Sequence, residues 1–199
     1  MELLNDIERT ILGDRACEWR HKHTSATTIP HCEIGARLIC SPSNTLDGLA
    51  RARIEHEAGH ALLTPTDIPE AWSPLKRSLV NALEDLRIER GVSRLSKDYE
   101  NDLKALNDHI IGKMQRHFKS GLLKGAIKAT SEAILAMLFT ENGHEPQWDM
   151  TPEARRLFSS AMDIFSEWRN ADCDTPAGFK AMEDIADRII ARWNNEKSI

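Results

Sequence analysis

The chain has 199 residues, of which 41% are hydrophobic and 29% charged, and its formal net charge at pH 7 is −5. This length and composition allow one sizeable core, so we expect one compact unit with room for a small subdomain. Proteins that attract the phosphate backbone concentrate positive charge, so the acidic balance disfavours nucleic acid as the main partner. No apolar run approaches the roughly 20 residues that span a bilayer. The first residues are acidic where a secretory signal is basic, and the four cysteines are scattered, so we predict a soluble protein of the reducing cytoplasm, without a membrane partner.

The N-terminal part predicts one short helix and one small β element. Apolar residues recur at helical spacing over residues 3–12, and Gly13 is expected to interrupt that helix. From Thr27 to Cys40 the chain has short β-branched and apolar runs, divided by Pro30 and Gly35. This pattern predicts a hairpin or an edge strand, and it is the only stretch that we expect to form β structure.

The rest of the chain predicts a series of helices. Prolines stand where a first helical turn favours them, at Pro74, Pro152 and Pro176. The helices are expected at about residues 46–63, 73–91, 97–119, 122–140, 152–170 and 176–194. We therefore predict a helix-dominated α+β fold. Residues 1–95 are expected to form a metal-binding core with the N-terminal helix, and residues 96–199 a helical subdomain that packs on it.

The first of these regions contains a candidate metal-binding motif. The run His56-Glu57-Ala58-Gly59-His60 matches HExxH on a predicted helix. Residues four apart lie on one helix face, so both imidazoles can bind one zinc ion at two corners of a tetrahedron. Glu57 borders that face without being a ligand, which places it to act on water as a general base. The alternative is that two exposed histidines have this spacing by chance.

A catalytic zinc usually has three protein ligands, and the next helix offers three acids. On a helical projection Glu84 lies at the margin of the apolar face, whereas Asp85 and Glu89 lie on the opposite polar stripe. Glu84 is therefore the predicted third ligand and Asp85 its substitute. Glu89 can then orient a ligand histidine through the second ring nitrogen. The alternative is an ordinary ion pair between Glu84 and Arg87, three residues apart.

Together the two segments resemble a known family. His56-Glu57-Ala58-Gly59-His60-Ala61, followed by Asn81-Ala82-Leu83-Glu84-Asp85-Leu86-Arg87-Ile88-Glu89, is similar to the gluzincin class of zincin metallopeptidases. More narrowly, it resembles the metallopeptidase-like regions found alongside von Willebrand factor A domains in cobaltochelatase-like proteins. The resemblance covers about residues 20–95. It implies a zincin core, in which an edge strand before the HExxH helix pairs with an extended peptide and a later helix supplies a glutamate. The Glu-x-x-x-Asp pattern of many gluzincins is not reproduced at Glu84, where the fourth residue on is Ile88.

These observations predict a zinc-dependent metallopeptidase that hydrolyses peptide bonds in a peptide or protein substrate. His56, His60 and Glu84 are the expected zinc ligands, and Glu57 is the expected base. The helical half is a possible surface for a protein partner. One alternative is a catalytically degenerate zincin-fold protein that acts as a metal-stabilised protein-binding module. Another is a helical adaptor in which the motif is accidental.

Residue type alone nominates two further groups. Tyr99, His109 and His117 are candidates for donors to an oxyanion, against the alternative of ordinary surface or core residues. A second set of metal-ligating residue types precedes the motif, but its spacing matches no familiar zinc site. These residues are Cys17, His21, His23, His31 and Cys32.

Overall fold

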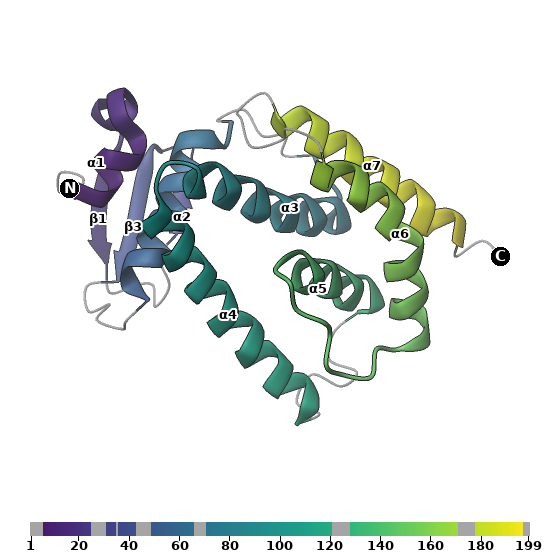
Figure 1. Ribbon diagram of the computed structural model, residues 1–199. Helices are drawn as coiled ribbons and strands as arrows, with labels where there is room; N and C mark the ends of the chain where they lie inside the picture. The colour runs from purple at the N-terminus through teal and green to yellow at the C-terminus, as the bar shows by residue number, and fades with distance from the viewer. Residues whose placement is uncertain are drawn as a thin grey trace. The chain divides into compact units, whose positions relative to one another are not determined.

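The structure, a computed structural model, describes residues 6–24, 31–34, 36–42, 49–65, 71–120, 128–170 and 178–196. Within these ranges the chain is dominated by helices and contains a small sheet, as the sequence predicted. The elements are α1 (Asp6–Leu12), the 3-10 helix η1 (Gly13–Glu18), β1 (Arg20–Thr24), β2 (His31–Glu33), β3 (Leu38–Pro42), α2 (Ala50–Leu63), α3 (Pro74–Ser93), α4 (Lys97–Lys119), α5 (Ala129–Glu141), α6 (Pro152–Asn170) and α7 (Gly178–Glu196) (Figure 1). None of the helices in these ranges combines the length and the apolar character needed to cross a membrane.

The chain folds into two compact units. Unit 1 comprises Met1–Pro69, Asp85–Leu106 and Asp174–Pro176, and unit 2 comprises Glu70–Glu84, Asn107–Cys173 and Ala177–Ile199. The sheet, α1 and α2 thus belong to unit 1, and α5, α6 and α7 belong to unit 2. This division falls inside α3 and inside α4, whereas the boundary expected from the sequence lies between residues 95 and 96, in the turn between those two helices.

The sheet in unit 1 has the order β1-β3-β2. Strand β1 runs parallel to β3 with His21 opposite Ile39, and β2 runs antiparallel to β3 with Cys32 opposite the same residue. His21, Ile39 and Cys32 therefore form one row on one face of the sheet. Ile39 is buried in a cluster with residues of α1 and α2, so this row faces those helices. The antiparallel pair β2–β3 agrees with the β element predicted between Thr27 and Cys40, although residues 25–30 lie outside the described ranges.

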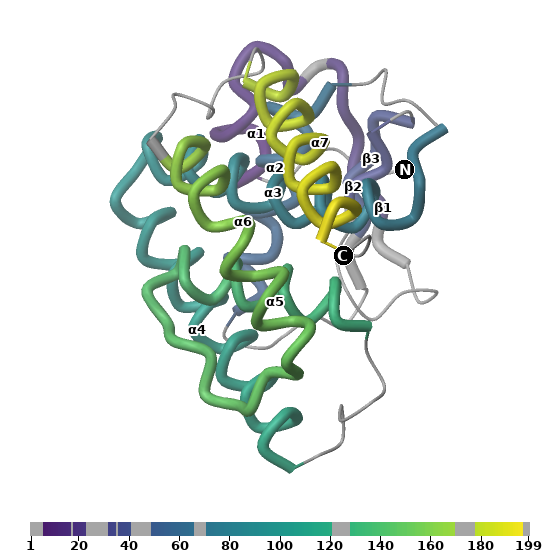
Figure 2. The backbone as a smooth tube through the Cα atoms, turned by 90° about the vertical axis from the view of Figure 1, so that its right-hand side faces the viewer, coloured from purple at the N-terminus to yellow at the C-terminus, as the bar shows by residue number. Residues whose placement is uncertain are grey.

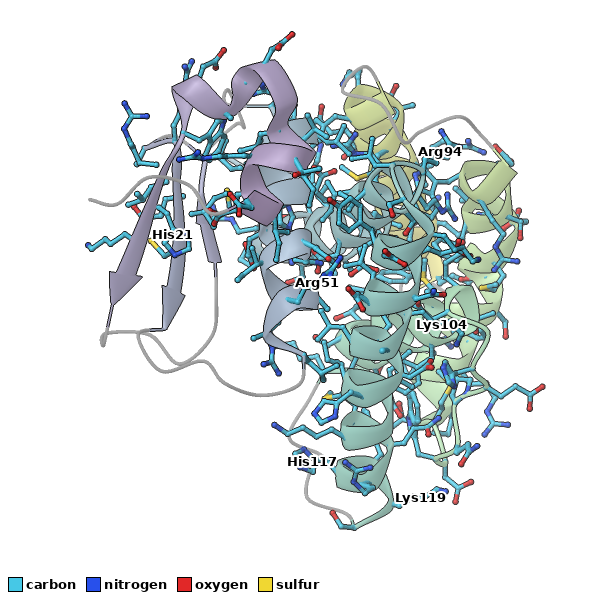
Figure 3. All side chains as sticks on the ribbon, turned by 60° about the vertical axis from the view of Figure 1, so that its left-hand side comes forward. His21, Arg51, Arg94, Lys104, His117 and Lys119 are labelled. Atoms are coloured by element: carbon cyan, nitrogen blue, oxygen red, sulfur yellow. The ribbon has the colours of Figure 1, made fainter. Side chains whose placement is uncertain are left out.

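Strand β1 was not predicted, because its sequence Arg20-His21-Lys22-His23-Thr24 has no apolar alternation. Its inward residue, His21, is nevertheless buried (Figure 3). Nδ1 of His21 lies 2.5 Å from Oε1 of the buried Glu8 on α1. A polar contact with a neighbouring helix thus takes the place of the apolar side chain that a pattern search requires.

The helix ends follow local sequence signals. Helix α1 ends at Leu12, and Gly13 adopts a φ of +53° as the backbone enters η1, which confirms the interruption expected at this glycine. Helices α4 and α6 have the predicted bounds, residues 97–119 and 152–170. Helix α5 begins at Ala129, after the extended Lys128 with φ −72° and ψ 151°, and the predicted start at 122 lies outside the described residues.

The core of unit 1 forms where α2 and α3 pack against α1 and the sheet. Its buried residues are Ile11, Leu12, Trp19, Ile39, Ala58, Ala61, Val92, Tyr99 and Leu103. Gly59, between the two motif histidines, packs closely against side chains of α3. A Cβ atom at Gly59 would lie 2.9 Å from Cγ2 of Val92 and 3.0 Å from Cδ1 of Ile88. No room exists for a side chain here, so this glycine sets the spacing between the two helices.

We expect Gly59→Ala to lower the free energy of unfolding by about 1 kcal/mol, because overpacking of about 2 kcal/mol exceeds the gain of up to about 1 kcal/mol in helix propensity. Urea unfolding followed by circular dichroism measures the change. Gly112→Ala in α4 is the matched control, since its Cβ would meet only Nη1 of Arg116 at 3.5 Å. This control is expected to be slightly stabilising, and stabilisation by both variants would contradict the close approach.

Unit 2 is built on α5, α6 and α7, with α5 packed on α6 and α6 packed on α7 (Figure 2). Trp168 and Trp193 are fully buried in this unit. Nε1 of Trp193 donates a hydrogen bond of 2.8 Å to the carbonyl of Leu157. Trp148 stacks on Phe118 with ring centroids 4.2 Å apart. Aromatic anchors thus join the helices of this unit.

Candidate metal centre

Two histidines of α2 and one aspartate of α3 converge in unit 1. His56 and His60 lie one turn apart, as the motif predicted, and their ring centroids are 5.0 Å apart. Oδ1 of Asp85 lies 3.3 Å from Nε2 of His60 and 3.7 Å from Nε2 of His56. One potential ligand atom from each of the three residues lies within 4.8 Å of the other two. Within the residues that the structure describes, this is the one group of three or more such side chains that can hold a metal ion.

The other ring nitrogen of each histidine is also engaged. Nδ1 of His56 lies 2.9 Å from Oε1 of Glu89, and because a carboxylate only accepts, the Nδ1–H donates. Nδ1 of His60 lies 3.1 Å from Oγ1 of Thr64. Histidines that bind metals usually have such a partner on the second nitrogen, which fixes the direction of the first. The contact expected between Glu89 and a motif histidine is therefore present, whereas sequence reasoning missed Thr64.

The three acids of α3 differ in burial and in what they face. Glu84 is 4% exposed, which agrees with its predicted place at the apolar margin, and Asp85 is 35% exposed. Asp85 faces the two histidines, and successive helical residues point about 100° apart, so Glu84 projects in another direction. The predicted substitute ligand, rather than the first choice, belongs to the converging group. Asp85 and Glu89 reproduce the four-residue spacing of Glu-x-x-x-Asp with the two acid types exchanged.

Several negatively charged side chains surround His56. Burial of the ring lowers the pKa of His56, but the hydrogen bond to Glu89 opposes this shift. The negative charges of Glu89, Asp85 and Glu57 act in the same direction as that bond, and the pKa of His56 rises to about 9. A site that favours a proton this strongly between carboxylates also suits a divalent cation in the proton's place.

Glu57, the predicted base, is half-buried on α2 between the two histidines. Burial is the main cause that raises the pKa of the Cys32 thiol, and the negative charge of Glu57 adds to it. The negative charge of Glu57 thus raises the pKa of both His56 and Cys32.

The second set of metal-ligating residue types is only partly described. Ile39 separates His21 from Cys32 in their row, which puts these two residues two strand spacings, or about 10 Å, apart. That separation does not suit one zinc ion. The side chains of Cys17, His23 and His31 lie outside the described part of the chain.

The candidates for an oxyanion donor fall in different places. Tyr99 belongs to the core cluster of unit 1, with the guanidinium carbon of Arg51 6.0 Å from its ring centroid. A core position agrees with the ordinary structural alternative for this residue. His109 and His117 lie on the part of α4 that belongs to unit 2, so their role stays a prediction.

The N-terminal turns of α2 are tied to α4 by Arg51. Glu55 is fully buried and accepts a hydrogen bond of 2.8 Å from Nε of Arg51, which is labelled in Figure 3. The same nitrogen lies 2.9 Å from Oδ2 of Asp102. Burial raises the pKa of Glu55 to about 7, although the hydrogen bond from Arg51 acts in the opposite direction. This contact holds the helix on the side away from Thr64, so α2 is anchored at both ends of the motif.

The donor set fits zinc. Zinc binds imidazole nitrogens and carboxylate oxygens at about 2.0–2.1 Å, and tetrahedral angles then place ligand atoms about 3.3 Å apart. The separations of 3.3 and 3.7 Å between Asp85 and the two histidines are close to that value. The chemistry of two imidazoles and one carboxylate leaves one corner of the tetrahedron for water.

No protein-family model, no curated protein and no solved structure matches the chain. The likeness to gluzincins therefore rests on the residues around His56 and Glu84 that carry it. The case for a metal site rests on these residues and on the geometry of unit 1.

Proposed function

We propose that the protein is a zinc-dependent peptidase with an HExxH site. In this proposal His56, His60 and Asp85 hold the metal, and Glu57 is the general base. The observation that carries the proposal is the convergence of both histidine Nε2 atoms on Asp85 Oδ1, with each Nδ1 engaged elsewhere. Glu84 stays the alternative third ligand.

The residues around the centre suit peptide hydrolysis. Zinc supplies a Lewis acid that polarises a carbonyl group and makes water reactive near neutral pH. A carboxylate oxygen of Glu57 accepts the proton of that water as its oxygen attacks the scissile carbonyl carbon. The same carboxyl then returns the proton to the amide nitrogen as the C–N bond breaks, so the balance is one water consumed per peptide bond.

The sheet offers a place for the substrate backbone. In the described sheet β2 (His31–Glu33) pairs with β3 on one side and has no strand on the other. An extended peptide can add to such an edge by main-chain hydrogen bonds. Since β2 also contacts α2, the added strand would pass beside the helix that bears the motif. This arrangement supports a peptide or protein substrate over a small molecule.

The first test is metal content. We expect close to one zinc per chain in the wild type by inductively coupled plasma mass spectrometry, after chelation, zinc reconstitution and dialysis. Zinc should be lost in His56→Ala and Asp85→Ala, because each removes one of three ligands. Glu84→Ala should keep it. His144→Ala is the matched control, since this histidine pairs with Asp108 in unit 2.

Each outcome selects one interpretation. Zinc that is lost in Glu84→Ala but kept in Asp85→Ala would make Glu84 the third ligand. Zinc that does not bind the wild type at all would overturn the metal site and favour the helical adaptor. Stoichiometric zinc without cleavage of any peptide in a broad library of internally quenched substrates would favour the metal-stabilised binding module.

A further inference from the structure

We propose that Thr64 is a positioning residue for the metal centre. In this inference, which rests on the proposed metal site, Oγ1 of Thr64 accepts the Nδ1–H of His60. That bond leaves the lone pair of His60 Nε2 directed at the metal. Neither the HExxH motif nor the resemblance to gluzincins assigns a role to this residue.

Thr64 holds His60 by two contacts. It is the C-cap of α2, and its backbone N–H donates a hydrogen bond of 2.9 Å to the carbonyl of His60. Its Oγ1 lies 3.1 Å from Nδ1 of the same histidine. Thr64 is buried, so water does not readily replace the hydroxyl. The two contacts join the backbone and the ring of His60 to one neighbour.

The next residue, Pro65, gives Thr64 the conformation that this contact requires. A residue before proline is driven out of the α region into extended conformations. Thr64 has φ −77° and ψ 131°, which is extended, and α2 ends at Leu63. The Thr-Pro pair therefore ends the helix and at the same time directs the hydroxyl back at the ring one turn earlier.

The direction of this hydrogen bond decides whether His60 can bind a metal. A neutral imidazole has one donor and one acceptor nitrogen. If the Thr64 hydroxyl donated to Nδ1, the proton would lie on Nε2, and that nitrogen could not be a ligand. The tautomer of His56 is already fixed, because the carboxylate of Glu89 can only accept a hydrogen bond from Nδ1. The centre thus has a charged partner on one histidine and a neutral partner on the other.

The test compares Thr64→Val, which removes the acceptor and keeps the shape, with Thr64→Ser, which keeps the hydroxyl. Zinc affinity is measured by competition with a chromophoric chelator on the full chain. We expect Thr64→Val to bind zinc about 10-fold more weakly, and Thr64→Ser to recover most of that loss. Thr140→Val in α5 is the matched control, since it also removes a threonine hydrogen bond, the one to the carbonyl of Ala136.

A nuclear magnetic resonance signal separates positioning from a general structural effect. In the zinc-loaded wild type and in Thr64→Ser, the Nδ1–H proton of His60 should be protected from exchange with water and visible. In Thr64→Val this proton should exchange with water and its signal should broaden, while the backbone amide spectrum remains that of a folded protein. Wild-type zinc affinity in Thr64→Val, or equal loss in the serine variant, would overturn the inference. If His56→Ala also leaves zinc binding unchanged, the metal site itself fails, which is a distinguishable result.

Discussion

Glu57→Gln is expected to lower the rate of peptide hydrolysis by about 10²–10⁴-fold while zinc content stays near one per chain. The amide of glutamine has nearly the shape of the carboxylate but cannot accept a proton from water. Glu57 is not in the group of side chains that can hold the metal, so the ligand set is unchanged. Initial rates on the internally quenched peptides, with metal analysis of the same preparation, measure both quantities.

The control for this substitution is Glu153→Gln, which makes the same change at an exposed position of α6 in unit 2. We expect it to keep both zinc and activity. Full activity in Glu57→Gln would remove Glu57 from the reaction. A loss of zinc together with activity would instead show that Glu57 contributes to metal binding.

Much of the fold could be predicted because its signals are local. The prolines at Pro74 and Pro152 and the glycine at Gly13 mark helix ends in the sequence, and the structure has ends at these positions. Strand β1 had no local signal, because its inward residue His21 is balanced by Glu8 from another element. A pattern search counts apolar positions and cannot see a polar pair that forms only in the folded state.

The candidate site, like the fold, could be predicted only where its signals are local. The spacing of His56 and His60 on one helix predicts a shared face, and the structure has it. The third group depends on how two helices pack, which the projection of a single helix does not give. Burial favoured Glu84, but the histidines are only half-buried, so the polar stripe with Asp85 is the part of α3 that faces them. The candidate metal centre lies at the margin of the core rather than within it.

The second prediction with a large expected effect concerns the C-terminal end of α2. The last carbonyls of a helix have no partner within the helix and carry partial negative charge. Nη1 of Arg15 donates to the carbonyl of Leu62, and Nη2 of Arg87 donates to that of Leu63 over 2.9 Å. The Arg87 side chain is fully buried. Two cations from different elements therefore hold the helix end that leads into Thr64.

Arg87→Met should lower the free energy of unfolding by about 3 kcal/mol, because it removes a buried charged hydrogen bond and leaves the Leu63 carbonyl without that donor. Urea unfolding of the metal-free protein measures this loss. The stability of Arg87→Lys should lie between those of the wild type and Arg87→Met, since lysine keeps the charge but lacks the several N–H donors of the guanidinium group.

The matched control is Arg188→Met, which breaks a surface pair with Glu167 in unit 2 and should change stability little. Zinc affinity should fall in Arg87→Met as well, since Thr64 directly follows the carbonyl that Arg87 binds. If Arg87→Met unfolded at the same urea concentration as Arg188→Met, the buried arginine would not be what holds the end of the motif helix. Reduced stability with unchanged zinc affinity would instead mean that the helix end and the orientation of His60 are independent.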